Sequence, residues 1–232
     1  MLLRAIPVLI GLAIGALFAG APALASDEYP EPRDGERIVF DVFRKGDIEF
    51  GTHEVVFEHD GQDVVARTTI RLRAGFGPIT AFRYEHDATE RWNDGQLLTL
   101  TSRTLKDGET YEVEARYEDG MINVTGLDPE QQPVDLALPS EILSSSHWHG
   151  YPADMEQMLN TEHGTVMETT VEDLGMTEIE GDGGTIPVRH IRLSSSLVVD
   201  LFYDENGRWA GCSFDARGQT VRYVRRANPV TG

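Results

Sequence analysis

Apolar and polar residues alternate with a period of two along much of this 232-residue chain. The pattern begins at Ile38, Phe40 and Val42, and it returns over 64–73, where apolar residues alternate with Arg and Thr. Successive side chains of a β-strand point to opposite faces of the sheet, so this period indicates strands with one buried face and one solvated face.

Short turn signals separate the strand-like runs. Gly46-Asp47, Asn93-Asp94-Gly95, Asp107-Gly108 and Asp119-Gly120 each fall between two such runs, which favours antiparallel neighbours. About a dozen strands are predicted, at 38–43, 50–57, 64–73, 82–92, 97–105, 111–117, 121–125, 166–171, 186–193, 197–203, 209–214 and 220–224. We therefore predict a mainly β fold, a large curved antiparallel sheet or incomplete barrel, in a single domain over 37–226.

The alternation weakens after Leu127, where prolines at 129, 133, 139 and 152 interrupt the chain. We predict that a segment of about 127–165 covers the open side of the sheet. Within it, Pro152–Leu159 is predicted as a short helix, since Pro152 suits a first turn and Met155, Met158 and Leu159 then share one side.

The amino-terminal residues predict a compartment. Arg4 precedes an apolar run over 5–19, and Ala23-Leu24-Ala25 has the small-x-small form of a signal-peptide cleavage site. Residues 1–25 are therefore predicted to be a signal peptide, which implies a periplasmic or secreted protein without a transmembrane segment after cleavage. We expect 26–36 to be an extended mature terminus and 227–232 to be a tail.

Composition and charge limit the classes of binding partner that the chain can have. The chain carries 20 basic and 39 acidic residues, for a net charge of −19. Nucleic acid is an unfavourable partner for so acidic a chain, because phosphate binding requires clustered Lys and Arg. Cys212 is the single cysteine, so no intramolecular disulfide can form and this residue is expected to be a buried small apolar group.

Several segments resemble a family of exported bacterial proteins known only as a domain of unknown function. The resemblance rests on Phe40-Asp41-Val42-Phe43-Arg44-Lys45-Gly46, Gly51-Thr52-His53, Tyr84-Glu85-His86 with Glu90 and Trp92, Val171-Glu172-Asp173-Leu174-Gly175 and Phe202-Tyr203-Asp204-Glu205-Asn206-Gly207-Arg208. This chain departs from the family pattern at Ser146-His147-Trp148-His149, where two histidines replace an aromatic residue and a Trp-Asn pair. The resemblance implies a periplasmic location and a curved sheet, and it assigns no catalytic residue.

Aromatic residues on the predicted inner face suggest ligand binding. The candidate binding residues are Phe82, Tyr84, His86, Trp92 and Trp148. Our leading hypothesis is a non-catalytic exported protein that binds an apolar or amphipathic molecule such as a lipid. The alternative is that these aromatics fill a core, and the strand histidines His53, His59 and His86 are then expected to be hydrogen-bonded core residues.

Two further function classes remain open. His147 and His149 are two apart, so an extended segment would point both rings to one side, and His163, Asp154 or Glu156 could complete a zinc site. That zinc site would suit a metal-assisted hydrolase. Nucleophile-elbow, Walker and His-Glu-x-x-His motifs are missing from the sequence. If the zinc site does not form, we therefore expect no cofactor. The third class is an envelope structural or assembly factor that contacts protein partners through an exposed strand edge.

Overall fold

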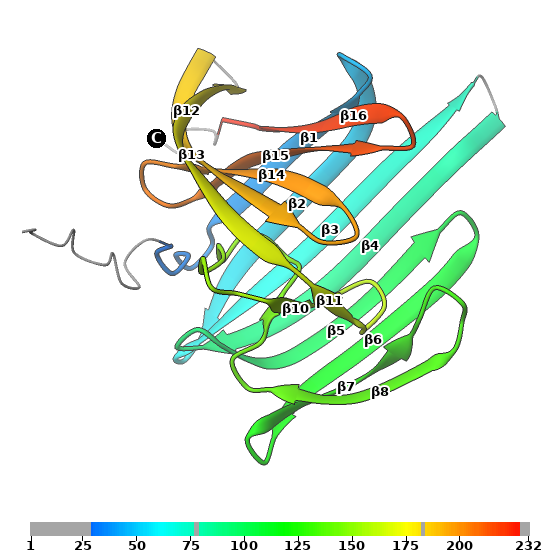
Figure 1. Cartoon of the computed structure of the whole chain (residues 1–232), viewed down its shortest axis with the longest axis vertical. Coiled ribbons are helices and arrows are strands. Elements are labelled where there is room, and N and C mark those ends of the chain that lie inside the picture. The colour runs from blue at the N-terminus through cyan, green and yellow to red at the C-terminus, as the bar shows by residue number, and fades with distance from the viewer. Residues whose placement is uncertain (1–28, 77–78, 182–183, 228–232) are drawn as a thin grey trace, which may run out of the picture.

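The computed structural model describes residues 29–76, 79–181 and 184–227, and within them every regular element is a β-strand (Figure 1). The strands are β1 (Arg37–Arg44), β2 (Ile48–Asp60), β3 (Asp63–Phe76), β4 (Ile79–Asn93), β5 (Gln96–Lys106), β6 (Glu109–Glu118), β7 (Met121–Leu127), β8 (Pro133–Pro139), β9 (Leu143–Ser144), β10 (Gln157–Leu159), β11 (Val166–Glu168), β12 (Thr170–Gly181), β13 (Gly184–Ser194), β14 (Val198–Asp204), β15 (Trp209–Ala216) and β16 (Gln219–Arg225). In this part of the chain, no helix reaches the length and hydropathy needed to cross a membrane.

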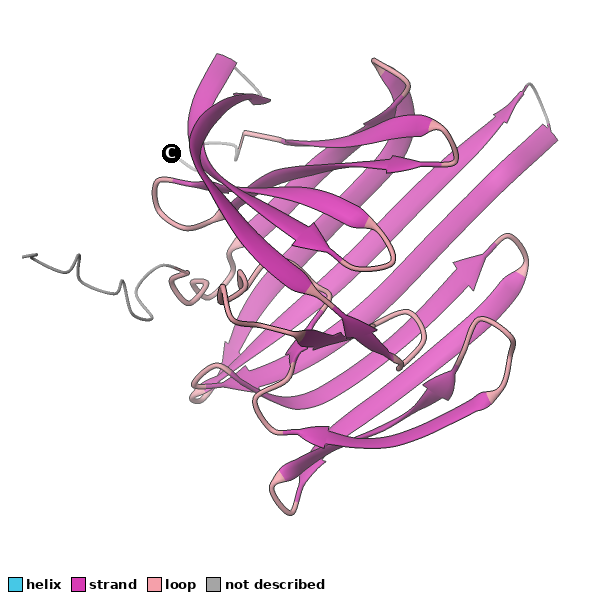
Figure 2. Ribbon diagram, in the orientation of Figure 1, coloured by secondary structure: helices cyan, strands magenta, loops and turns pink. Residues whose placement is uncertain are grey.

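Thirteen strands form one strongly curved sheet, in the order β12-β13-β14-β15-β16-β1-β2-β3-β4-β5-β6-β7-β8 (Figure 2). Every neighbouring pair is antiparallel. The first strand, β1, pairs with the last strand, β16, near the middle of the sheet. β12 and β8 are the two edges of this sheet, so it does not close into a barrel. The predicted large, curved antiparallel sheet is confirmed.

Two-residue turns set the register of the consecutive strands β4, β5, β6 and β7. The pairs Asp94-Gly95, Asp107-Gly108 and Asp119-Gly120 all have positive φ, with the three aspartates at 47°, 51° and 53°. Positive φ at both central residues is the requirement of a type I′ hairpin turn, and Asp-Gly satisfies it at low cost. The turn signals of the sequence thus act as predicted.

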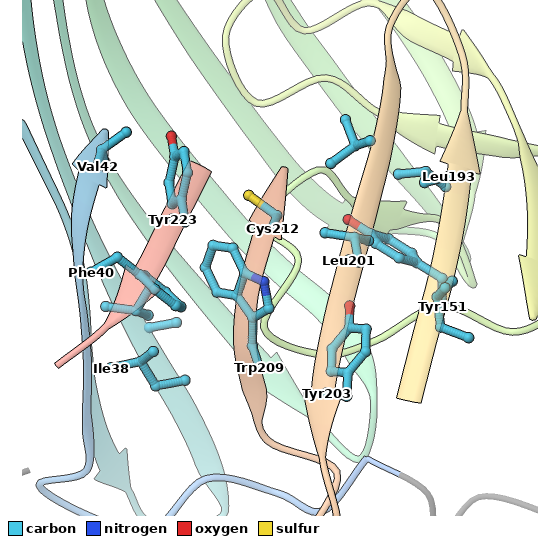
Figure 3. Close-up of a cluster of buried hydrophobic side chains, with 14 of the residues drawn as sticks. Ile38, Phe40, Val42, Tyr151, Leu193, Leu201, Tyr203, Trp209, Cys212 and Tyr223 are labelled. Atoms are coloured by element: carbon cyan, nitrogen blue, oxygen red, sulfur yellow. The ribbon is translucent and has the colours of Figure 1, made fainter. Parts of the chain in front are cut away.

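A segment over 142–170, here called the inner segment, lies on the concave face of the sheet (Figure 1). It contains the small sheet β11-β10-β9. One core cluster joins β1–β3 to β13–β16 and includes Met158, while a second joins β4–β8 and includes Ile142 and Leu159. Leu143 and Trp148 pack against both clusters. Figure 3 shows the first cluster, in which Trp209 lies between Phe40 and Tyr223 on one side and Leu201 and Tyr203 on the other.

The inner segment differs from the predicted cover in two respects. Pro152–Leu159 is not helical, because Met158 and Leu159 lie in β10 and point to different clusters, one on each side of the strand. The prediction of cover at 127–139 is also wrong, since Pro133–Pro139 forms β8. β8 is an edge strand with prolines at its two ends, where the missing N–H groups cost little.

The remaining domain predictions fall partly outside the described residues. The predicted signal peptide, 1–25, and all but one residue of the tail, 227–232, lie there. Of the predicted extended terminus, residues 29–36 form no strand. They are held against the sheet by Arg208, whose guanidinium donates to the carbonyls of Pro30 at 2.7 Å and Glu31 at 3.2 Å.

Candidate ligand-binding cavity

A cavity of about 1410 Å³ lies between the concave face of the sheet and the inner segment. Its lining residues fall toward one end of each strand, for example 70–74 on β3, 82–86 on β4 and 219–223 on β16. We call this end of the cavity, at the hairpin turns Asp107-Gly108 and Arg217-Gly218, its mouth. Four residues of extended strand separate mouth and inner end, a depth of about 13 Å at 3.3 Å per residue.

The inner segment forms the second wall. Ser145, Met158, Met167 and a run over 160–163 line the cavity from it. Two contacts fix the wall to the sheet: the Ser102 hydroxyl donates to the carbonyl of Thr161 at 2.5 Å, and the Lys106 ammonium lies 2.7 Å from a Glu162 carboxylate oxygen.

A glycine allows this close approach. A Cβ atom at Gly126 on β7 would lie 2.4 Å from the carbonyl oxygen of His163. A side chain there would therefore displace the wall.

Apolar side chains dominate the surface between mouth and inner end. Phe50 and Phe82 pack together at the mouth with ring centroids 5.4 Å apart. Deeper lining residues include Ile70, Leu72, Leu193, Val199, Cys212, Phe214, Val221 and Tyr223. Burial raises the pKa of the Cys212 thiol, so this residue is an apolar lining group rather than a thiolate.

Three histidines line the inner end, and all are neutral at pH 7. Burial is the first cause in each case, and it lowers the pKa of His53 to about 3, that of His86 to about 4 and that of His147 to about 3. His86 Nδ1 lies 2.8 Å from the Thr104 hydroxyl, and His147 Nδ1 lies 2.7 Å from the Tyr151 hydroxyl. Neither ring nitrogen of His53 has a hydrogen-bond partner among the described residues.

The mouth carries three basic side chains. Lys106 pairs with Glu162, and Arg217 pairs with Asp107 at 3.1 Å. Arg44 forms no ion pair within the described part of the chain; its Nη1 donates to the Gln219 side chain at 3.0 Å, and its buried Nε has no partner. The mouth therefore holds one guanidinium whose charge is not offset by a neighbouring carboxylate.

The predicted binding residues separate into two groups. Phe82, Tyr84 and His86 line the cavity. Trp92 and Trp148 do not; their rings pack edge to face at 5.9 Å, beyond the inner end. The two tryptophans fill a core, as the alternative interpretation expected. The other three residues face the cavity.

The expectation of hydrogen-bonded strand histidines holds for His86 and fails for His53. His59 is exposed, and its Nε2 lies 2.8 Å from the Pro32 carbonyl oxygen.

The predicted zinc ligands do not come together. His147 has a φ of 65°, so its segment is not extended and the premise that both rings point to one side is wrong. His149 Nδ1 lies 2.8 Å from the Gly150 carbonyl oxygen, and His163 Nε2 lies 2.9 Å from Glu162. Over the described ranges, no group of three or more His, Cys, Asp or Glu side chains is placed to hold a metal ion.

A buried carboxylate, which the sequence did not reveal, fastens the inner segment to the sheet. Glu90 on β4 is fully buried. It accepts hydrogen bonds from Ser144 at 2.8 Å, from Trp92 Nε1 at 2.9 Å and from Ser146. Burial raises the pKa of Glu90 while these three donors oppose that shift.

The comparisons with known proteins agree with this architecture. A crystal structure of a β-barrel-like protein of the domain of unknown function DUF1849 from Brucella abortus superimposes with a TM-score of 0.57 at 14% identity, over 82% of this chain and 94% of that one. At this identity the likeness is one of fold. No curated protein sequence matches the chain. The model of a domain of unknown function, DUF6134, matches residues 40–226, and this chain belongs to that family.

Proposed function

We propose that this chain is an exported, periplasmic binding protein without catalytic activity, and that it holds an apolar or amphipathic molecule such as a lipid in the cavity. The observation that carries the proposal is the cavity itself. Its volume of about 1410 Å³ exceeds the roughly 300–1,000 Å³ of ordinary small-molecule pockets. A cavity of that size suits a ligand with a long chain or several rings.

The chemistry of the lining favours binding over catalysis. The inner imidazoles are weak bases because burial lowers the pKa of each to about 3 or 4, two of them are held by hydroxyl groups, and the Cys212 thiol is kept protonated by burial. Activation of a nucleophile requires a base in reach and a route for charge stabilisation. The lining instead offers apolar surface with a few fixed polar groups, which is the usual composition of a binding pocket.

A titration with a fluorescent fatty acid tests the proposal. Trp209 lines the cavity, so ligand uptake should change its emission. Ala74 lies on the inner face opposite Phe82, and Ala74→Trp should fill the mouth and lower the affinity about tenfold, by loss of about 1.4 kcal/mol. Ala137→Trp, on the exposed side of β8, is the matched control and should bind like the wild type.

Native mass spectrometry of protein prepared from cells should then show a retained small molecule in the wild type and less of it in Ala74→Trp. Wild-type protein that takes up neither the fatty acid nor a cellular molecule would overturn the proposal. That result would favour an envelope assembly factor, whose contact surface would be the edge strand β12 with its exposed Met176.

A further inference from the structure

His53 is a buried polar residue of the cavity whose side chain has no hydrogen-bond partner among the described residues. It lies on β2 at the inner end, it is 5% exposed, and both of its ring nitrogens lack a hydrogen-bond partner in the described structure. Aromatic rings surround it: the centroids of Trp209, Tyr223 and Phe40 are 5.1, 5.7 and 6.0 Å away.

The cross-strand neighbours of His53 supply no partner. Its cross-strand neighbours in the register are Phe40 on β1 and Ile70 on β3, and neither side chain carries a polar atom. His86 follows Ile70 in the same row across the sheet, and it does have a partner, because its Nδ1 lies 2.8 Å from the Thr104 hydroxyl. A buried polar group without a partner costs about 1–3 kcal/mol, so the fold tolerates at His53 a cost that it avoids two strands away, at His86.

The protonation state of His53 limits what can satisfy it. A neutral imidazole has one N–H donor and one nitrogen acceptor. It carries no charge to offset an ionised carboxylate or phosphate, and burying such an anion among Trp209, Tyr223 and Phe40 would be costly. A hydroxyl group can donate to and accept from the ring, and a carbonyl oxygen can accept from its N–H.

We propose that the inner end of the cavity recognises a neutral oxygen function, an alcohol or ketone, on an otherwise apolar ligand, and that His53 makes the hydrogen bond. This inference rests on the proposed function and names its ligand class. The apolar part of such a ligand lies along Ile70, Leu72 and Phe82 toward the mouth, since these side chains line the route.

A competition assay with four ten-carbon probes tests this assignment. Decane, 1-decanol, 2-decanone and decanoate compete for the full-length protein loaded with a fluorescent reporter. We expect the alcohol and the ketone to bind about tenfold more tightly than decane, the effect of one buried hydrogen bond. His53→Leu, which removes the polar atoms, should abolish this preference while decane binds as before or better. His53→Gln, which keeps a neutral donor and acceptor, should retain part of it.

His59→Leu is the matched control, because His59 lies on the same strand and is exposed. It should leave all four affinities unchanged. An unaltered alcohol preference in His53→Leu, or tightest wild-type binding of decanoate with no difference between decanol and decane, would overturn the inference and leave the proposed function standing. Failure of every probe and of the reporter to bind wild-type protein would overturn both.

Discussion

Mild acid should destabilise this protein because four imidazoles, the buried His53 and His86 and the half-buried His147 and His149, are held in their neutral form. Burial is the largest cause in every case, and it lowers the pKa of His53 and His147 to about 3 and that of His86 and His149 to about 4. Each group has a folded-state pKa below its unfolded value of about 6.5. Its stabilising contribution is therefore fully present above pH 6.5 and is lost as the pH falls toward 4 and then 3.

The magnitude follows from proton linkage. At pH 5 an unfolded histidine has bound its proton while the folded one has not, which costs about 2 kcal/mol for each group. Four such groups lose about 8 kcal/mol, within the range of 5–15 kcal/mol that is the whole stability of a typical domain. Glu90 acts in the opposite sense, because its raised pKa favours the folded state at low pH. It is one group against four.

Urea unfolding followed by tryptophan fluorescence at pH 7 and pH 5, at one ionic strength, measures this loss. We expect the free energy of unfolding to fall by at least about 4 kcal/mol between the two values, and the fall to shrink by about 2 kcal/mol in His53→Leu. His59→Leu, at an exposed position of the same strand, should leave the difference unchanged. Equal stability at the two pH values would refute the assignment of these four residues as neutral groups.

Two further substitutions test the attachment of the inner segment and the mouth. Glu90→Ala leaves the Ser144, Ser146 and Trp92 donors unpaired. Urea unfolding should show that it lowers the free energy of unfolding by about 3–5 kcal/mol. A loss below about 1 kcal/mol would show that the donors find other acceptors. Arg44→Gln removes the unpaired charge of the mouth. In the competition assay it should weaken the binding of decanoate about tenfold without affecting that of 1-decanol. An equal effect on both probes would mean that the arginine acts through packing alone.

The sheet could be predicted from the sequence because its determinants are local. Alternation in runs such as 64–73 and the Asp-Gly turns specify strands and hairpins from residues within a few positions of each other. β8 was missed because Pro133 and Pro139 suggest a loop, although an edge strand accepts proline at its ends. The false helix at 152–159 arose because Met155, Met158 and Leu159 are spaced at helical intervals, whereas Met158 and Leu159 lie in a short strand buried on both faces.

The candidate site depended on pairings that no local pattern reveals. Glu90 and Ser146 are 56 residues apart in the chain, and only the folded sheet brings them together. His53 was expected to be satisfied because most buried polar groups are. Its lack of a partner depends on the side chains that the register places beside it, Phe40 and Ile70.

The cavity follows from the way the inner segment fills the curved sheet. A sheet this large must bury its concave face, and the inner segment covers the half formed by β4–β8, where Leu159 enters the second cluster. Toward β1–β3 and β13–β16 it contributes Met158, Tyr151 and Trp148, while the strand ends that carry Phe50 and Phe82 line the cavity. Apolar surface left in this position is unfavourable in water. A bound apolar molecule would complete the core that the chain leaves unfinished, and its binding should therefore stabilise the fold in proportion to the logarithm of its concentration.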